Sequence, residues 1–226
     1  MAAVLAIDTS TSACSVALNL GDRLISRYSE EPRSHTRLVM SMVDEVLAEA
    51  GLKARALDGL AVTLGPGSFT GLRIGFAAIQ GLAFGLDLPV VAISTLLVMA
   101  ETAVRKQGLG YGRVIVAVLD ARMGEFNCGC YQREENGHLS AIKDDQLLNA
   151  EGALQLINGY EDCVVVGEAS GLELPTFIDV YPDAVDLLKI AKRRFATGLA
   201  QPIDEIELVY LRGADAWQKR KRIRAV

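Results

Sequence analysis

The residues best suited to chemistry form a glycine-rich loop in the first third of the chain. An apolar run over 60–64 indicates a buried strand, which breaks at Gly65-Pro66-Gly67. After Gly71 an uncharged run over 74–85 is long enough for a helix. A strand, a glycine-rich loop and a helix N-terminus, in this order, direct backbone N–H groups and the positive end of the helix dipole at the space before the loop. The pattern therefore favours a site for an anion such as phosphate.

The loop does not match the two common phosphate-binding motifs. A P-loop has a Lys directly after its last glycine, whereas Leu72 follows Gly71 here. The dinucleotide fingerprint is Gly-x-Gly-x-x-Gly, and the spacing from Gly67 to Gly71 is one residue too wide for it. Two interpretations stay open: an anion site of another kind, or a tight loop that needs unusual backbone angles.

A carboxylate at the end of the first strand is the second candidate for chemistry. The apolar run over 4–7 ends in Asp8, and a small polar turn leads into the next strand. If the chain binds a nucleotide or another anion, this turn and the glycine-rich loop would hold it. The residues would be Asp8, Ser10, Thr11, Gly67 and Ser68. The alternative, which we favour for Asp8, is a turn residue that bonds the backbone of its own loop.

Two helices flank the glycine-rich segment, and both carry more apolar residues than one core-facing stripe needs. The first is expected from a cap at Ser34 to Gly51. The second has Ala77, Gly81 and Gly85 four residues apart, a spacing that lets another backbone come close. The additional apolar residues indicate either a helix packed between the sheet and a neighbour within the subunit, or a face that binds another chain. On the second interpretation the partner-binding residues are Leu38, Val39, Met42, Val46, Arg73 and Phe76.

The chain repeats its opening pattern after a glycine-rich linker over 106–112. The run over 116–120 ends in Asp120 as the run over 4–8 ends in Asp8, and a turn and a strand follow in both places. Asn136-Gly137 predicts a hairpin, and helices are predicted over 147–157 and 182–195. A duplicated unit, a β-meander followed by βαβ, predicts two similar α/β domains with a cleft between them. We expect domains at 1–106 and 113–212, with a basic tail over 213–226.

Composition excludes several classes of protein. Half of the 226 residues are hydrophobic, which excludes a disordered chain, and the net charge of −5 argues against nucleic-acid binding by bulk charge alone. No signal peptide is recognisable, and the apolar helix is too short to span a membrane. The four cysteines have no metal-site spacing and are expected to be buried, reduced thiols, with Cys128 and Cys130 on one side of a strand. These features favour a cytoplasmic protein.

The motifs resemble two levels of known family. The duplicated unit resembles the paired ribonuclease-H-like domains of actin and the sugar kinases, which implies mixed five-stranded sheets flanked by helices. The run over 65–75, with the segments 7–10, 34–35 and 209–212, is similar to the TsaB (YeaZ) family over essentially the whole chain. The resemblance implies a subunit for threonylcarbamoyladenosine formation beside the anticodon of ANN-decoding tRNAs. It implies docking to the catalytic paralogue TsaD, joined by TsaE and ATP, with tRNA bound through the complex and self-pairing when TsaD is absent.

Measured against this resemblance, the chain lacks the groups for catalysis of its own. TsaD's metal site needs two histidines four residues apart on a helix, and Val39 stands four residues after His35, which we expect to cap a helix or lie on the surface. After Asp120 an ATPase of this fold needs glycine, and the chain has Ala121-Arg122-Met123. We therefore expect no catalytic residues, no metal and no cofactor of its own, with ATP only in the complex. A small kinase or ATPase is the alternative, and a serine peptidase lacks its motif.

Overall fold

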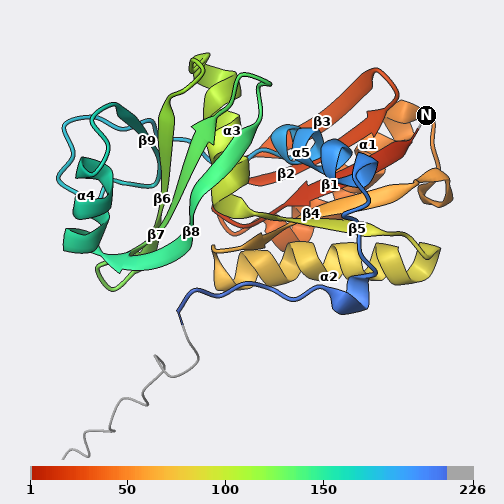
Figure 1. The fold of residues 1–226 in the computed structure, drawn as a ribbon. Coiled ribbons are helices and arrows are strands. Elements are labelled where there is room, and N and C mark those ends of the chain that lie inside the picture. Colours follow the sequence, from red (N-terminus) through yellow and green to blue (C-terminus); the bar gives the residue numbers. More distant parts are fainter. Residues whose placement is uncertain (1, 213–226) are drawn as a thin grey trace, which may run out of the picture.

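The first half of the chain builds a five-stranded mixed sheet in the order β3-β2-β1-β4-β5 (Figure 1). The computed structural model describes residues 2–212, so the expected basic tail over 213–226 lies outside it. Strand β1 is antiparallel to β2 and parallel to β4, as a β-meander followed by βαβ requires. The five strands are β1 (Ala3–Asp8), β2 (Cys14–Leu20), β3 (Arg23–Ser29), β4 (Gly59–Gly65) and β5 (Val90–Ser94).

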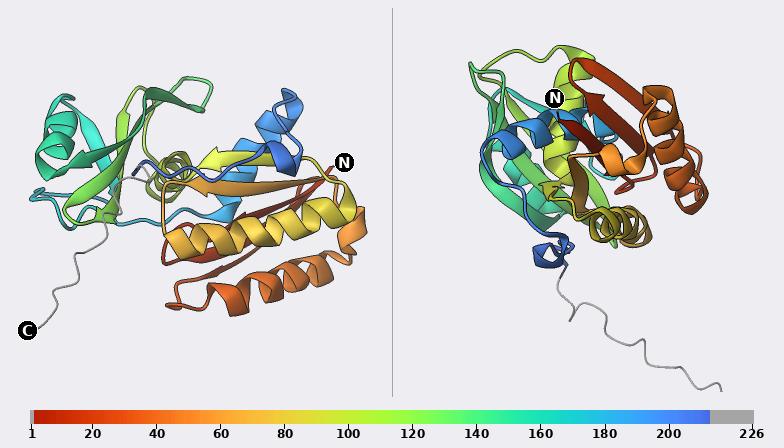
Figure 2. Two further views of the ribbon diagram at one scale, coloured as in Figure 1. Left: turned by 90° about the horizontal axis from the view of Figure 1, so that it is seen from below. Right: turned by 90° about the vertical axis from the view of Figure 1, so that its right-hand side faces the viewer.

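Helices cover both faces of this sheet because its inner strands β1, β2 and β4 are buried on both sides. Leu5 and Ile7 of β1 face α1 (His35–Ala50) and α2 (Phe69–Leu86), which lie side by side (Figure 2). Val4 and Ala6 face the opposite way, toward α5 (Ala184–Ala196). The alternation follows from the two-residue period of a strand, which points successive side chains to opposite faces.

The second half repeats the topology with one strand fewer. Its sheet has the order β8-β7-β6-β9, so the prediction of five strands is wrong for this half. A single bridge between Val166 and Ile178 stands where a fifth strand would pair. Cys128 and Cys130 pack on the same face, beside α4, as expected. The elements are β6 (Val114–Arg122), β7 (Glu125–Arg133), β8 (Leu139–Asn149), α4 (Ala150–Asn158) and β9 (Cys163–Gly167).

The two halves interlock, so the expected ranges 1–106 and 113–212 do not follow the packing. Helix α3 (Thr95–Gln107) belongs to the first range but packs five buried residues into one core of the second sheet, and lies between the two sheets (Figure 1). Helix α5 belongs to the second range but packs on the first sheet, where its Ala184 N–H donates to Ser15 Oγ at 2.9 Å. The 3₁₀ turns Ala54–Ala56 and Ile203–Glu205 complete the described elements.

Two local predictions need correction. The helix expected from Leu147 begins only at Ala150, because Leu147 and Leu148 pair with β7 and Asn149 Oδ1 caps the helix by accepting from Gly152 N at 2.8 Å. Ser34 occupies the cap position of α1, but its hydroxyl donates to Glu31 O at 2.6 Å and makes no cap bond.

Candidate docking site

The glycine-rich loop is closed by the chain's own first turn. Thr9 Oγ1 donates to Gly71 O at 2.8 Å, and Ser68 N donates to Ser10 O at 2.7 Å. A Cβ added to Gly67 or Gly71 would overlap the carbonyl oxygens of Ser10 and Thr9, respectively. The glycines therefore permit close packing between the loop and the turn over 9–11, and the space before the loop is filled by protein.

Asp8 holds this turn together from inside the subunit. The side chain is fully buried, and its Oδ1 accepts from Ser10 Oγ and from Thr63 Oγ1, both at 2.6 Å, and from Ser10 N at 3.3 Å. Burial raises the pKa of this carboxyl to about 6. The interpretation of Asp8 as a residue bonding its own loop is confirmed.

The expected anion loop is therefore not an open site. Asp8, Ser10 and Thr11 are buried, and Ser68, although exposed, caps α2 by accepting from Gly71 N at 3.2 Å. Phosphate binding would need free donors around a cavity, and these residues direct their polar groups at one another. The loop is not open because it packs directly against the turn over 9–11, a long-range contact that no motif in the sequence predicts.

His35 supports the same turn and is neither a cap nor a surface residue, contrary to the prediction. The ring is buried, and Nε2 lies 3.0 Å from Thr11 O and 3.1 Å from Ala13 O. Within residues 2–212 no group of three His, Cys, Asp or Glu side chains could hold a metal ion.

The corresponding region of the second half is a small polar pocket of about 260 Å³. It gathers Asp120, Glu168 and Asp179 around Arg122. Asp120 accepts from Arg122 N at 2.7 Å, and burial followed by the charge of Asp120 raises the pKa of the Glu168 carboxyl. Three carboxylates around one guanidinium oppose the binding of a phosphate group.

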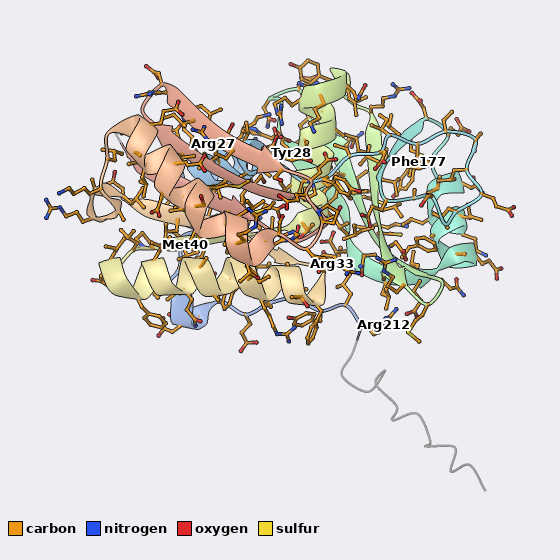
Figure 3. The ribbon with its side chains drawn as sticks, turned by 180° about the vertical axis from the view of Figure 1, so that it is seen from behind. Arg27, Tyr28, Arg33, Met40, Phe177 and Arg212 are labelled. Atoms are coloured by element: carbon orange, nitrogen blue, oxygen red, sulfur yellow. The ribbon has the colours of Figure 1, made fainter. Side chains whose placement is uncertain are left out.

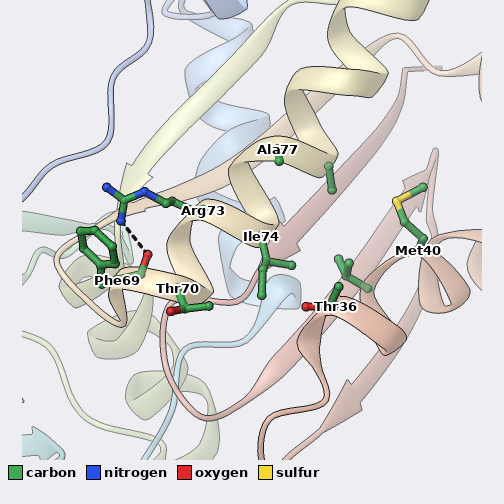
Figure 4. A pocket seen from close by; sticks show the side chains of 9 residues that line it. Thr36, Met40, Phe69, Thr70, Arg73, Ile74 and Ala77 are labelled. Atoms are coloured by element: carbon green, nitrogen blue, oxygen red, sulfur yellow. Dashed lines mark hydrogen bonds between the residues drawn. The ribbon is translucent and has the colours of Figure 1, made fainter.

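An open apolar groove runs between α1 and α2 (Figure 4). Its volume is about 510 Å³, and Met40 of α1 lies on the side that faces α2 (Figure 3). The lining residues are Thr36, Val39, Met40, Phe69, Thr70, Arg73, Ile74, Ala77 and Ala78. An apolar groove between two neighbouring helices on the outside of a sheet fits a further helix or pair of helices.

Two of the expected partner-binding residues, Met42 and Val46, are wrong, because they are at most 6% exposed and pack in the core between α1 and the first sheet. Val39 is also buried in that core, at 3% exposed, and reaches the groove only at its floor. The broad apolar stripe of α1 serves both the sheet and α2, so its width does not require another chain. Leu38 and Phe76 are half-buried against the same core, while Arg73 is exposed at the rim of the groove.

The exposed face lies mainly on α2. Phe69 is 57% exposed and Phe84 is 64% exposed, and a Cβ at Gly81 or Gly85 would meet nothing within 4 Å. The predicted small-residue spacing therefore faces open space. By length and composition α2 is also the single helix within residues 2–212 that could cross a membrane, although its inner side, including Ile79, is buried on the sheet.

Met40, Phe69 and Phe84 were missed by the sequence analysis. Phe69, Arg73, Ala77 and Gly81 recur every four residues, and this period places them on one side of a helix. The four-residue spacing could have predicted the exposed face of α2, because the residues that pack on the sheet, such as Leu72 and Ile79, lie on the other side of the helix.

Comparison with known proteins places these features in context. Residues 29–165 match the family model described as "TsaD: tRNA N6-adenosine threonylcarbamoyltransferase". The chain is 38% identical to the tRNA threonylcarbamoyladenosine biosynthesis protein TsaB of Escherichia coli (strain K12), over 96% of this chain and 97% of that one. The protein of the same name from Haemophilus influenzae is 37% identical over 96% of both chains. The structure titled "YeaZ from Pseudomonas aeruginosa" superposes with a TM-score of 0.83 at 36% identity, covering 93% of this chain and all of that one.

Two glycines of α2 provide a matched test of the closed loop. Gly71→Ala should lower the free energy of unfolding by roughly 2–3 kcal/mol, because the new methyl group overlaps a backbone carbonyl that cannot rotate away. Gly81→Ala should leave it unchanged or raise it by up to about 1 kcal/mol, since the site is open and alanine favours the helix. Urea unfolding of both variants measures the difference, and equal effects would contradict the packing.

The burial of Asp8 predicts a defined pH dependence. Its folded pKa is raised above the unfolded value, so the folded state holds the proton more tightly, and stability falls as pH rises from about 4 to about 6. The full loss is about 3 kcal/mol. In Asp8→Asn this decline should be absent. The difference between the two plots of unfolding free energy against pH isolates the contribution of Asp8. Burial also raises the pKa values of Asp145 and Asp186, but these residues contribute equally to both plots. Parallel curves would refute the prediction.

Proposed function

This chain belongs to the TsaB (YeaZ) family, and from that premise we propose that it is a non-catalytic subunit of the complex that adds the threonylcarbamoyl group to adenosine beside the anticodon of ANN-decoding tRNAs. The observation that carries the proposal is the open groove on α1 and α2 next to a glycine-rich loop that is closed. The chain has an exposed apolar surface that can bind a partner, whereas its glycine-rich loop is not an open phosphate site. Its role is then to dock, in the cytoplasm where tRNA is modified.

The partner that fits the groove is the catalytic paralogue TsaD. A match to the TsaD family model over 29–165 spans α1 and α2, so the paralogue carries related helices. Two helices from each chain would form a four-helix bundle, with Gly81 and Gly85 allowing close approach. TsaE and ATP join this heterodimer, and tRNA binds through the complex. Without TsaD the same face supports a self-dimer.

ATP is assigned to the complex, with no cofactor for this chain alone. A small kinase or ATPase, the alternative function, would need phosphate donors from both halves of the fold. In the first half Ser68 N and Gly71 N are used within the subunit, and in the second half Glu168 and Asp120 stand at the pocket. No feature of residues 2–212 favours the alternative.

Substitutions on the exposed side of α2 test the docking face. Gly81→Leu should weaken binding to the TsaD paralogue at least about tenfold, because the side chain fills the space that a partner backbone needs. Met40→Glu, at a 42% exposed position in the groove, should have a similar effect by placing a charge in an apolar contact. Titration calorimetry with purified TsaD measures the affinities.

The control for these variants is Gln155→Leu, an exposed position on α4 of the second half. It adds the same side chain to a helix surface away from the groove and should bind TsaD as the wild type does. Thermal unfolding of all three variants should stay close to wild type. Undiminished TsaD binding by Gly81→Leu and Met40→Glu would rule out this face.

The basic tail supplies a second test, from its sequence alone. Lys219, Arg220, Lys221, Arg222 and Arg224 follow Trp217 in an otherwise acidic chain. Removing the residues after Asp215 should lower the affinity of the complex for tRNA. It should also flatten the salt dependence, by about 0.7–0.9 in log–log slope for each tRNA phosphate that the tail neutralises. Fluorescence anisotropy with labelled tRNA at several salt concentrations measures both, and an unaltered slope would exclude the tail from tRNA binding.

A further inference from the structure

Arg73 is a cation fixed at the rim of the groove, where no acidic side chain of residues 2–212 pairs with it. Its guanidinium lies 3.3 Å from the centroid of the Phe69 ring and 5.2 Å from that of Tyr210, and the two ring centroids are 5.7 Å apart. Its NH1 group donates to Phe69 O at 3.0 Å (Figure 4). The ion pairs formed within residues 2–212 do not include Arg73.

Tyr210 is delivered to this position by a C-terminal strap, residues 206–212. The strap starts at Ile206, which is buried in the first core, and Val209 N donates to Leu64 O at 3.0 Å. It ends at Arg212, which binds the β6–β7 turn of the second half by donating from Nε to Glu125 Oε2 at 3.0 Å and from NH2 to Arg122 O at 3.1 Å. The strap runs beside α2 before it reaches that turn (Figure 1). Tyr210 is therefore held between two anchored ends.

Stacking and the bond to Phe69 O fix the plane of the Arg73 guanidinium, while most of its N–H donors stay free. A planar, oriented guanidinium is suited to bidentate pairing with a carboxylate, and fixing it beforehand removes the entropy cost of ordering it on binding. We infer that Arg73 is the charge-recognition point of the docking groove, held ready by the strap, and that the docked helix brings a carboxylate to it. This inference rests on the proposed docking function.

A carboxylate fits this position better than a phosphate. Apart from Arg73, the groove-lining residues that the structure describes offer only apolar side chains and two threonine hydroxyls, those of Thr36 and Thr70. Arg212, the nearest cation on the strap, is already paired with Glu125. A phosphate group needs several converging donors, whereas one guanidinium fork matches one carboxylate.

Charge reversal on both partners tests the pairing. Arg73→Glu should weaken binding of the TsaD paralogue by more than tenfold. Arg73→Lys should recover only part of the loss because lysine lacks the planar fork. Arg212→Gln, outside the groove, should weaken binding severalfold because it releases the strap. Changing each acidic residue on the facing TsaD helices to Arg in turn should identify one that restores the affinity of Arg73→Glu.

Arg55→Glu is the matched control, since Arg55 is exposed and does not line the groove, and it should bind within about twofold of wild type. If Arg73→Glu behaves like this control while Gly81→Leu weakens binding, the inference fails and the docking proposal stands. If wild-type chain and TsaD do not associate, both fail. If Arg73→Glu docks normally but the complex no longer binds ATP, then the anion that Arg73 recognises is a phosphate and the proposed carboxylate is wrong.

Discussion

The contact between the turn over 9–11 and the glycine-rich loop is the interaction on which the rest of the structure depends, because it closes the loop. Gly71 can approach the Thr9 carbonyl only because Gly71 has no side chain, and Asp8, Thr63 and His35 hold the turn from behind. Most of the polar groups of the turn and the loop bond to one another, although Asp8 Oδ2 is buried without a hydrogen-bond partner among the described residues. Burial disfavours the charged form of the Asp8 carboxyl, and the three hydrogen bonds to its Oδ1 offset only part of that cost, so the closed arrangement is most stable when Asp8 is protonated.

Closing the loop leaves α2 with two different sides. The inner side, with Leu72, Gly75 and Ile79, packs on the first sheet, and the outer side keeps small residues and exposed aromatic rings. The two halves also interlock, because α3 and α5 each pack across the boundary and Arg105 of α3 pairs with Asp186 of α5 at 2.9 Å.

Much of the architecture could be predicted because it follows from local sequence patterns. The strand periods, the Asn136-Gly137 turn and the repeat at Asp8 and Asp120 predicted the meander and its copy. Long-range contacts could not be predicted: nothing in the sequence says that the hydroxyl of Thr63 meets Asp8, or that α5 returns to the first sheet. The broad stripe of α1 was misjudged for the same reason, since sequence periodicity does not distinguish a neighbouring helix of the same chain from a partner.

The most direct test of the account is binding of ATP to the isolated chain. Titration calorimetry of the purified full-length protein with magnesium and ATP, alongside an assay for released phosphate, addresses the closed loop without any partner. A closed loop predicts no saturable heat and no phosphate release from the chain alone. Stoichiometric binding with turnover by the isolated chain would contradict it, and would show that the loop opens into a working phosphate site.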